Sequence, residues 1–457
     1  MHFLSRRGAA IRCAVLFTAA ALLPITPAAA ESPSENGFDV SGSFRIRGDA
    51  IDGQFRPGKA EDDAILMLRT TLLASYTINP VTVVAELFDA RVYGQDPGTP
   101  IGTGEVNALE PLQAYIGLDL GSIVGSGFAG DLKAGRLTMD IGSSRLIGRS
   151  GDANFPTAYT GAMADVTAPG DNRFQIFWTM PNIRLPKGNA SLQDNEVEFD
   201  RSTSDIQFYG AHYSRPLFGG VEGEIFAYQL EENDAPGYAT SNRDLLTYGA
   251  RISRAPAVDA VDFDLEYARQ QGEIRASSAP TADTDLDVEA YFMHAEVGQK
   301  LRGSWSPRVS AHFDVASGDD SGSDYGRFDP LFGIRRGEFG PTSIYGPAKR
   351  SNVISGGVQV EAKPNDRFNI STMYRALWLE EATDSFGATG VRDPLGASGT
   401  WAGNQLELRL RYWLIPGRLE MEGGGAYLDK GRFLRAAPNA PATGDTRYAY
   451  LSLLTAF

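Results

Sequence analysis

Ser310, His312 and Asp314 have the types and spacing in this sequence that come nearest to a catalytic set. A hydroxyl, an imidazole and a carboxylate are the groups of a serine hydrolase. Positions two apart share one face of a strand, so a strand here would bring the three together. An enzyme acting on membrane lipid would need them on a lipid-facing surface, but the alternation around them puts His312 and Asp314 on the polar face. A lipid-modifying enzyme is therefore kept only as an alternative, and no catalytic residues are expected.

Metal chemistry has weak support. Three histidines lie beyond residue 30, and none stands at metal-ligand spacing with another. Asp319, Asp320 and Asp324 in a Gly/Ser-rich stretch could hold calcium, but they lack the full spacing of a calcium loop. The one cysteine, Cys13, lies within the first thirty residues, so no disulfide is expected beyond them. We expect no metal and no cofactor.

Arginine is the charged residue that recurs at regular positions. Arg45 and Arg47 alternate with Phe44 and Ile46, so one face of the segment is charged and the other is apolar. A period of two is typical of a β-strand. Eight arginines have the parity of the polar face: Arg45, Arg47, Arg69, Arg173, Arg251, Arg375, Arg409 and Arg411. The elements that position these side chains are therefore expected to be strands.

Eighteen segments show this alternation. They span about 38–48, 65–78, 81–93, 112–120, 131–141, 161–168, 173–181, 205–215, 221–231, 244–254, 261–270, 286–299, 308–317, 352–363, 367–379, 404–415, 418–429 and 446–457. Their connections are long after odd-numbered segments and mostly short after even-numbered ones, as at Asn79-Pro80. Long loops at one end and tight turns at the other are typical of outer-membrane barrels. The sequence predicts an all-β, transmembrane, antiparallel up-and-down β-barrel of about 18 strands.

The two ends of the sequence fit this plan. Residues 1–30 have a basic start, an apolar stretch and a run of alanines, which predicts a signal peptide cleaved after Ala30 and a barrel over residues 31–457. Unpaired amides are costly in hydrocarbon, so the last segment must pair with the first. It ends at Phe457, a terminal aromatic residue typical of barrels that the outer-membrane assembly machinery receives. We expect the cell outer membrane of a Gram-negative bacterium, with contact to its lipid.

Net charge excludes one class of partner. The chain carries −15 at pH 7, and removal of residues 1–30, which hold three arginines and no acidic residue, takes the charge to −18. Such a chain repels nucleic acid, which is not expected as a partner. A hydrophobic content of 42% fits a soluble protein as well as a barrel that is apolar at alternate positions, so periodicity has to decide.

Six dispersed stretches carry a further signal. They are Ala85–Val92, Leu112–Tyr115, Gly135–Arg136, Arg145–Gly148, Ala316–Asp319 and Phe328–Phe332. Together and in this order they resemble the alginate export family of outer-membrane porins, and the resemblance covers nearly the whole chain after residue 30. It implies an eighteen-stranded barrel whose inward arginines and a few acids line a narrow pore. Carried over by motif, the pore-lining residues are Glu86, Asp89, Arg91, Arg136 and Arg145.

Arginine side chains and the resemblance together predict a passive channel. Guanidinium groups stay charged and donate paired hydrogen bonds to carboxylates, so we expect anionic or polyhydroxylated solutes, including an anionic polysaccharide such as alginate. The alginate exporter of the family has a long periplasmic turn after its sixteenth strand, whereas Pro416-Gly417 is short here, so that gate is not expected. General uptake of small solutes without polymer export is an alternative. Another is that the arginines only pair with acids to hold the wall.

Overall fold

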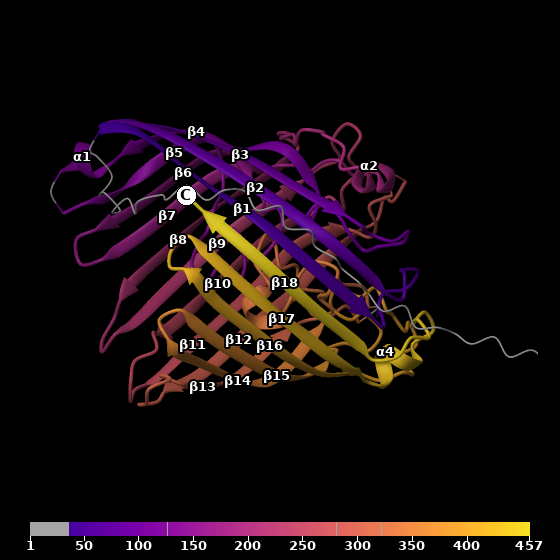
Figure 1. The fold of residues 1–457 in the computed structure, drawn as a ribbon. Coiled ribbons are helices and arrows are strands. Elements are labelled where there is room, and N and C mark those ends of the chain that lie inside the picture. Colours follow the sequence, from indigo (N-terminus) through magenta and orange to yellow (C-terminus); the bar gives the residue numbers. More distant parts are fainter. Residues whose placement is uncertain (1–35, 126, 280, 321) are drawn as a thin grey trace, which may run out of the picture. The chain divides into compact units, whose positions relative to one another are not determined.

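The alternating segments fold as the strands of one antiparallel sheet that closes on itself (Figure 1). The computed structural model describes residues 36–457 except 126, 280 and 321, and these form one compact unit. The expected signal peptide over residues 1–30, with its cleavage after Ala30, lies outside the described residues. No helix among the described residues is both long and apolar enough to cross a membrane.

The described residues form eighteen strands and four short helices. The strands are β1 (Asn36–Asp52), β2 (Asp63–Ile78), β3 (Val81–Tyr93), β4 (Asn107–Asp119), β5 (Ala129–Leu137), β6 (Tyr159–Ala168), β7 (Asn172–Pro181), β8 (Ile206–Pro216), β9 (Val221–Glu232), β10 (Asp244–Arg254), β11 (Val261–Arg275), β12 (Asp285–Lys300), β13 (Arg308–Ala316), β14 (Val353–Asn365), β15 (Phe368–Trp378), β16 (Trp401–Ile415), β17 (Leu419–Lys430) and β18 (Thr446–Ala456). The helices are α1 (Gly121–Val124), α2 (Asn189–Gln193), α3 (Arg336–Phe339) and α4 (Arg432–Ala436).

Closure pairs the first strand with the last. β1 is hydrogen-bonded to β2 on one side and to β18 on the other, in a register that sets Ser43 opposite Ala456. Phe457 and Gly42 exchange two backbone hydrogen bonds of 3.0 Å. Each strand in the described part of the chain therefore has two neighbours, which satisfies the N–H and C=O groups that lipid cannot.

All eighteen predicted strands are present in order, and their boundaries differ from the predicted ones by up to five residues. β5 ends at Leu137 instead of 141, because the chain leaves the wall there to enter the barrel. β11 continues to Arg275 instead of 270, through a mostly polar end that lacks apolar alternation. β4 begins at Asn107 instead of 112, and its pairing with β3 shifts register near Leu112. A bulge adds a residue and so interrupts the period of two from which the strand was predicted.

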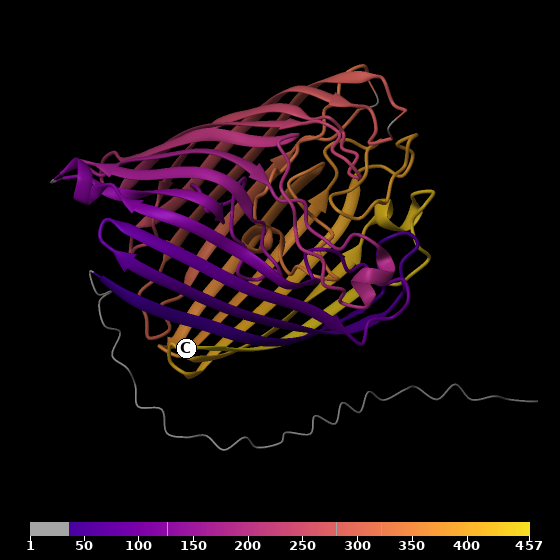
Figure 2. The same cartoon turned by 90° about the horizontal axis from the view of Figure 1, so that it is seen from above.

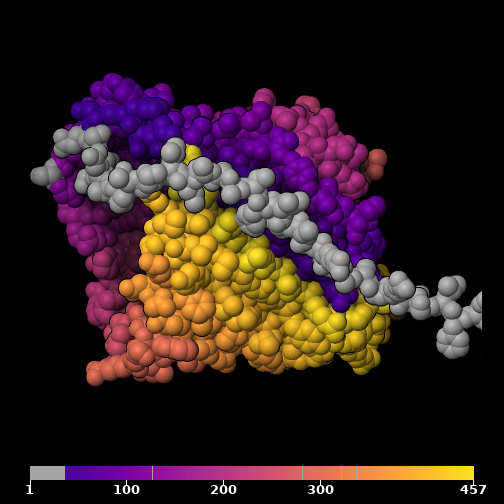
Figure 3. Space-filling view, viewed as in Figure 1, coloured from indigo at the N-terminus to yellow at the C-terminus, as the bar shows by residue number. Residues whose placement is uncertain are grey.

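The outer face of the wall is apolar. Along β7, the side chains of Phe174, Ile176 and Trp178 are exposed. Gln175 and Thr179, at alternate positions of the same strand, are buried on the inner side. Figure 3 shows β14–β18, in orange and yellow, as a continuous outer surface. Exposed apolar side chains around a more polar lining are what a lipid bilayer requires of a barrel.

Replacing Ile176 with arginine tests this orientation. Ile176 is 57% exposed within β7, and an arginine that faces the bilayer midplane destabilises a barrel by about 2–4 kcal/mol. We expect a loss of that size in the free energy of unfolding, measured by urea titration in lipid vesicles. Ile123 is similarly exposed but lies on α1 in a turn, so Ile123→Arg is the matched control. Equal losses for the two variants would contradict a lipid-facing β7.

Part of the barrel interior is apolar, which the alternation did not predict. Phe55, Phe339 and Tyr345 of the loops are fully buried and share one apolar cluster with Phe208 and Phe292, which point inward from β8 and β12. Figure 2 shows loop segments lying inside the wall. The inner face is therefore polar toward the short turns, and apolar where it receives the long loops.

Candidate functional site

Two long loops enter the barrel and narrow it. The first constriction loop, residues 138–158, joins β5 to β6, and the second, residues 317–352, joins β13 to β14. The two pair through a bridge between Ile147 and Phe332, with two backbone hydrogen bonds around it. The two loops therefore lie against each other as well as against the wall.

Arg45 and Arg69 hold the first constriction loop against β1 and β2. Their guanidinium groups donate to the backbone oxygens of Gly151, Asp152 and Ala153 over 2.8–3.2 Å. Hydrogen bonds from a charged donor are stronger than neutral ones. Both arginines point inward, and the loop occupies their donors.

Arg145 lies where the two constriction loops meet the opposite wall. It extends from the first loop to Asp264 (2.9 Å) and Glu266 (2.7 Å) of β11. Its Nε also donates to Glu338 of the second loop. Arg350 pairs with the same Glu338, and burial together with the nearby Arg145 charge lowers the pKa of Arg350 to about 9, so this guanidinium stays charged at neutral pH. One ionic cluster thus ties both loops to the wall.

The other inward arginines pair with carboxylates of the lining. The pairs are Arg47–Asp49, Arg173–Asp165, Arg251–Glu224, Arg251–Asp264, Arg375–Glu407, Arg409–Asp152, Arg409–Glu422, Arg411–Glu420 and Arg411–Glu422. These arginines differ in how much of the side chain is exposed. The side chains of Arg47 and Arg375 are 2% and 1% exposed, so these residues stabilise the wall. Those of Arg409 and Arg411 are 31% and 36% exposed and can meet a solute.

Two cavities on opposite sides of the lumen differ in charge. One of about 290 Å³ lies along β16–β18, β1 and β2, and five arginines and three carboxylates line it: Arg45, Arg47, Arg69, Arg409, Arg411, Asp152, Glu420 and Glu422. The other, of about 440 Å³, lies along β9–β13 and has four carboxylates and three arginines: Glu222, Asp262, Asp264, Glu296, Arg251, Arg254 and Arg308. The first cavity, called here the arginine-rich cavity, has an excess of positive charge and the second an excess of negative charge.

Asp89 and Arg91 do not line the lumen, so their predicted placement is wrong. On β3 they have the parity of Leu87, whose side chain is exposed on the outer face. They pair with each other there at 3.0 Å. Both residues were predicted to line the pore from the family motif alone. The period of two along β3 puts them on the opposite face from Glu86, which points inward. Glu86 pairs at 2.7 Å with Arg149 of the first constriction loop.

Arg136 is also outside the lumen, contrary to the prediction. It has the parity of Leu132, which is exposed on the outer face of β5. Its guanidinium pairs with Glu110 of β4 and with Asp200 of the loop 182–205. Burial raises the pKa of Asp200. Arg136 therefore fastens this loop to the wall beside the irregular start of β4.

Sequence reasoning missed the loop residues that complete the site. Arg149, Asp152, Glu338 and Arg350 all lie in the two constriction loops and bind inward side chains of the wall or of the other loop. Loop residues follow no period, so nothing in the sequence indicated which of them turn inward. The length of the connection 317–352 was the one signal, because loops of that length are commonly functional.

Asp319, Asp320 and Asp324 give no support to calcium binding. Within the described ranges, the one group of three metal-ligating side chains that lie close together is elsewhere. Asp319 accepts a hydrogen bond from Gly326 N, and Asp320 accepts one from Gly322 N. These carboxylates shape their own loop instead of converging on one point.

The hydrolase set is only half assembled. Ser310 Oγ and His312 Nε2 are 2.8 Å apart, but Asp314, the expected third member, lies 2.6 Å from His294. Glu296 is 3.7 Å from His312 Nδ1, which is too far for a hydrogen bond. Ser310 and His312 are buried on the inner face, so neither faces lipid.

Comparison with known proteins finds one family and several similar folds. A model described as alginate export matches residues 37–447. No curated protein matches the sequence. Similar solved structures include OccK9 (OpdG) of Pseudomonas aeruginosa, with a TM-score of 0.58 and 11% identity over 92% of this chain and 98% of that one. OccAB2 of Acinetobacter baumannii gives 0.57 and 13% over the same shares. At such identity the likeness concerns the fold alone.

Proposed function

The chain belongs to the alginate export family and is an outer-membrane β-barrel, and we propose that it is a passive channel for anionic or polyhydroxylated solutes. The family and the closed barrel point to a channel rather than to an enzyme. In this proposal solute passes the two constriction loops and follows the arginine-rich cavity, where Arg409 and Arg411 face the lumen.

The charge difference between the two sides of the lumen is the observation that carries this proposal. Five arginines and three carboxylates line the arginine-rich cavity, and Arg47 is compensated by Asp49 behind the lining, so one positive charge is left over on the side formed by β16–β18, β1 and β2. A lining of one sign raises the local concentration of oppositely charged solute. Guanidinium groups also donate hydrogen bonds in a fork that fits a carboxylate or a pair of hydroxyls.

The constriction loops limit solute size. They are held by the Arg145 cluster and packed through fully buried Phe339 and Tyr345. A channel filled in this way favours small anionic or sugar-like solutes. An anionic polysaccharide such as alginate would have to pass as an extended single chain.

Replacing Arg409 and Arg411 together with glutamine tests the charge argument. The change removes two positive charges from the arginine-rich cavity and leaves its carboxylates in excess. Two charges at about 6 Å in screened water change the energy of a small anion by about 0.7 kcal/mol, so the anion-to-cation permeability ratio is expected to fall severalfold. The ratio is measured from the reversal potential across a planar bilayer with a salt gradient.

Arg91→Gln is the control for this experiment, because Arg91 lies on the outer face of β3. It should leave the reversal potential unchanged. An unchanged potential in the double variant with normal conductance would show that Arg409 and Arg411 only stabilise the wall. Absence of any conductance from the wild-type protein would overturn the channel itself.

Delivery to the membrane is proposed to use the last strand. Phe457 is 74% exposed after β18 and is bonded only through its backbone to Gly42 in the contacts described above. A terminal aromatic side chain placed in this way is available to the barrel assembly machinery. Lipid then contacts the apolar outer face.

A further inference from the structure

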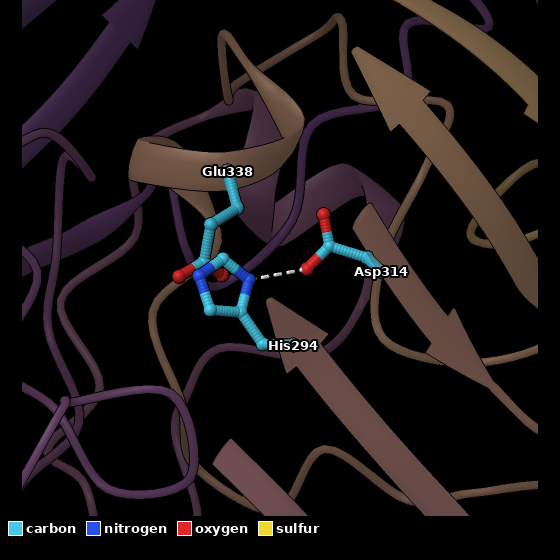
Figure 4. A group of neighbouring side chains, drawn as sticks. All are labelled: His294, Asp314 and Glu338. Atoms are coloured by element: carbon cyan, nitrogen blue, oxygen red, sulfur yellow. Dashed lines mark hydrogen bonds and ion pairs between the residues drawn. The ribbon is translucent and has the colours of Figure 1, made fainter. Parts of the chain in front are cut away.

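His294 and Asp314 form a buried pair at the point where the second constriction loop meets the wall (Figure 4). They are opposite each other in the register of β12 and β13, and His294 Nδ1 is 2.6 Å from Asp314 Oδ1. Glu338 of α3 extends from the second constriction loop toward the imidazole. Ligand atoms of the three side chains all lie within 4.8 Å of one another. Three elements distant in sequence thus bring a nitrogen and two carboxylates together.

Three atoms of this group have no hydrogen-bond partner within the described ranges: His294 Nε2, Asp314 Oδ2 and Glu338 Oε2. The side chains of His294 and Asp314 are almost completely buried, at 0% and 1% exposure. A buried polar atom without a partner is unfavourable. If Nδ1 donates its proton to Asp314, then Nε2 presents a lone pair. The Nε2 lone pair and the Glu338 carboxylate are both suited to a cation.

The net charge around the pair also favours a bound cation. The network of ion pairs around Glu338 holds four carboxylates and three guanidinium groups: Glu224, Asp264, Glu266, Glu338, Arg145, Arg251 and Arg350. With neutral imidazoles it has an excess of one negative charge, and Asp314 lies beside it with Arg350 and Arg375 as charged neighbours. Uncompensated charge is unfavourable in a buried position, and a divalent ion supplies the missing charge.

We propose that His294, through Nε2, and Glu338 bind a divalent transition-metal ion such as Zn²⁺, with Asp314 holding the ring through Nδ1. Imidazole nitrogen and carboxylate oxygen are ligands that zinc accepts at about 2.0–2.2 Å. The hydrogen bond from Nδ1 to Asp314 orients the ring, as in carboxylate–histidine–zinc sites. Glu338 accepts a hydrogen bond from Arg145 and forms an ion pair with Arg350, but each carboxylate oxygen has a second lone pair for the ion.

The ion would fasten the second constriction loop to β12 and β13. Glu338 is the loop's contribution, whereas His294 and Asp314 belong to the wall. Bound metal would therefore hold the loop inside the lumen. This consequence rests on the proposed channel function, and it predicts that Zn²⁺ lowers the conductance of the wild-type protein.

Metal binding is tested on the full-length processed protein without a histidine tag, in detergent. Titration with Zn²⁺ against a fluorescent zinc indicator should show one ion bound per chain. His294→Gln and Glu338→Gln should each weaken binding about tenfold or more. His312→Gln is the matched control, since His312 is another buried, inward-facing histidine of the same region, and its affinity should equal that of wild type. Heat-dependent migration in gels verifies that each variant is folded.

Failure of the wild-type protein to bind Zn²⁺ at micromolar concentration would overturn the site, and so would equal affinity in all variants. If a variant does not fold, the absorption spectrum of Co²⁺ bound to the wild type decides instead, since nitrogen and oxygen ligands give a distinct d–d band. Zn²⁺ that binds without lowering conductance would overturn the fastening of the loop, while absent conductance in metal-free protein would overturn the channel function separately.

Discussion

Arg145→Met is expected to lower the free energy of unfolding by about 3–5 kcal/mol, because removing one partner of a buried ion pair leaves the other charges without compensation. Arg145 pairs with Asp264, Glu266 and Glu338. Asp264 and Glu338 keep a second arginine, but Glu266, only 3% exposed, loses its ion pair. Urea titration of the barrel in lipid vesicles, followed by tryptophan fluorescence, measures the change.

Arg149→Met is the matched control in the same loop. Arg149 is about one-third exposed and pairs with one carboxylate, Glu86, which keeps a hydrogen bond from Gln113 when Arg149 is removed, so its loss should cost less than that of Arg145, about 1 kcal/mol. Adding Glu266→Gln to Arg145→Met should restore much of the stability, since the uncompensated charge is then removed. Equal losses for the two methionine variants, or no rescue, would show that the Arg145 cluster does not hold the loops.

The wall of the barrel was predictable because it repeats one physical rule. Each strand must turn apolar side chains toward lipid and its other face inward, so a run such as Phe174 to Thr179 fixes both the strand and its orientation. The same rule placed the eight arginines chosen by parity on the inner face. It would also have rejected Asp89 and Arg91, which were chosen by motif against the parity of β3.

The lumen was less predictable, since loop residues and not strand residues complete it. Nothing periodic marks Asp152 or Glu338 as inward-facing, and their positions follow from contacts across more than one hundred residues of chain. Ion pairing and burial also decide which inward arginines a solute can reach, and parity does not show this. Sequence parity shows that Arg375 points inward, but only the structure shows that Glu407 pairs with it and that it is buried.

Replacing Arg45 and Arg69 together with alanine is expected to raise the single-channel conductance severalfold. The two guanidinium groups make six hydrogen bonds to residues 151–154 of the first constriction loop. Bonds from a charged donor contribute about 1.5–3 kcal/mol each at most, and few other contacts hold this part of the loop to β1 and β2. Without them the loop gains access to open conformations of low free energy, which widens the lumen.

Recordings in planar bilayers at fixed salt measure this effect, and Arg47→Ala provides the comparison. Arg47 lies two residues from Arg45 on the same face of β1, but it pairs with Asp49 and Tyr448 within the wall and touches neither constriction loop in the contacts found. Its loss should lower stability and leave the conductance near the wild-type value. If conductance rose equally in both variants, general loosening of the wall would explain it. If only the double variant rose, the loop anchored at Gly151–Ala153 is what sets the width of the channel.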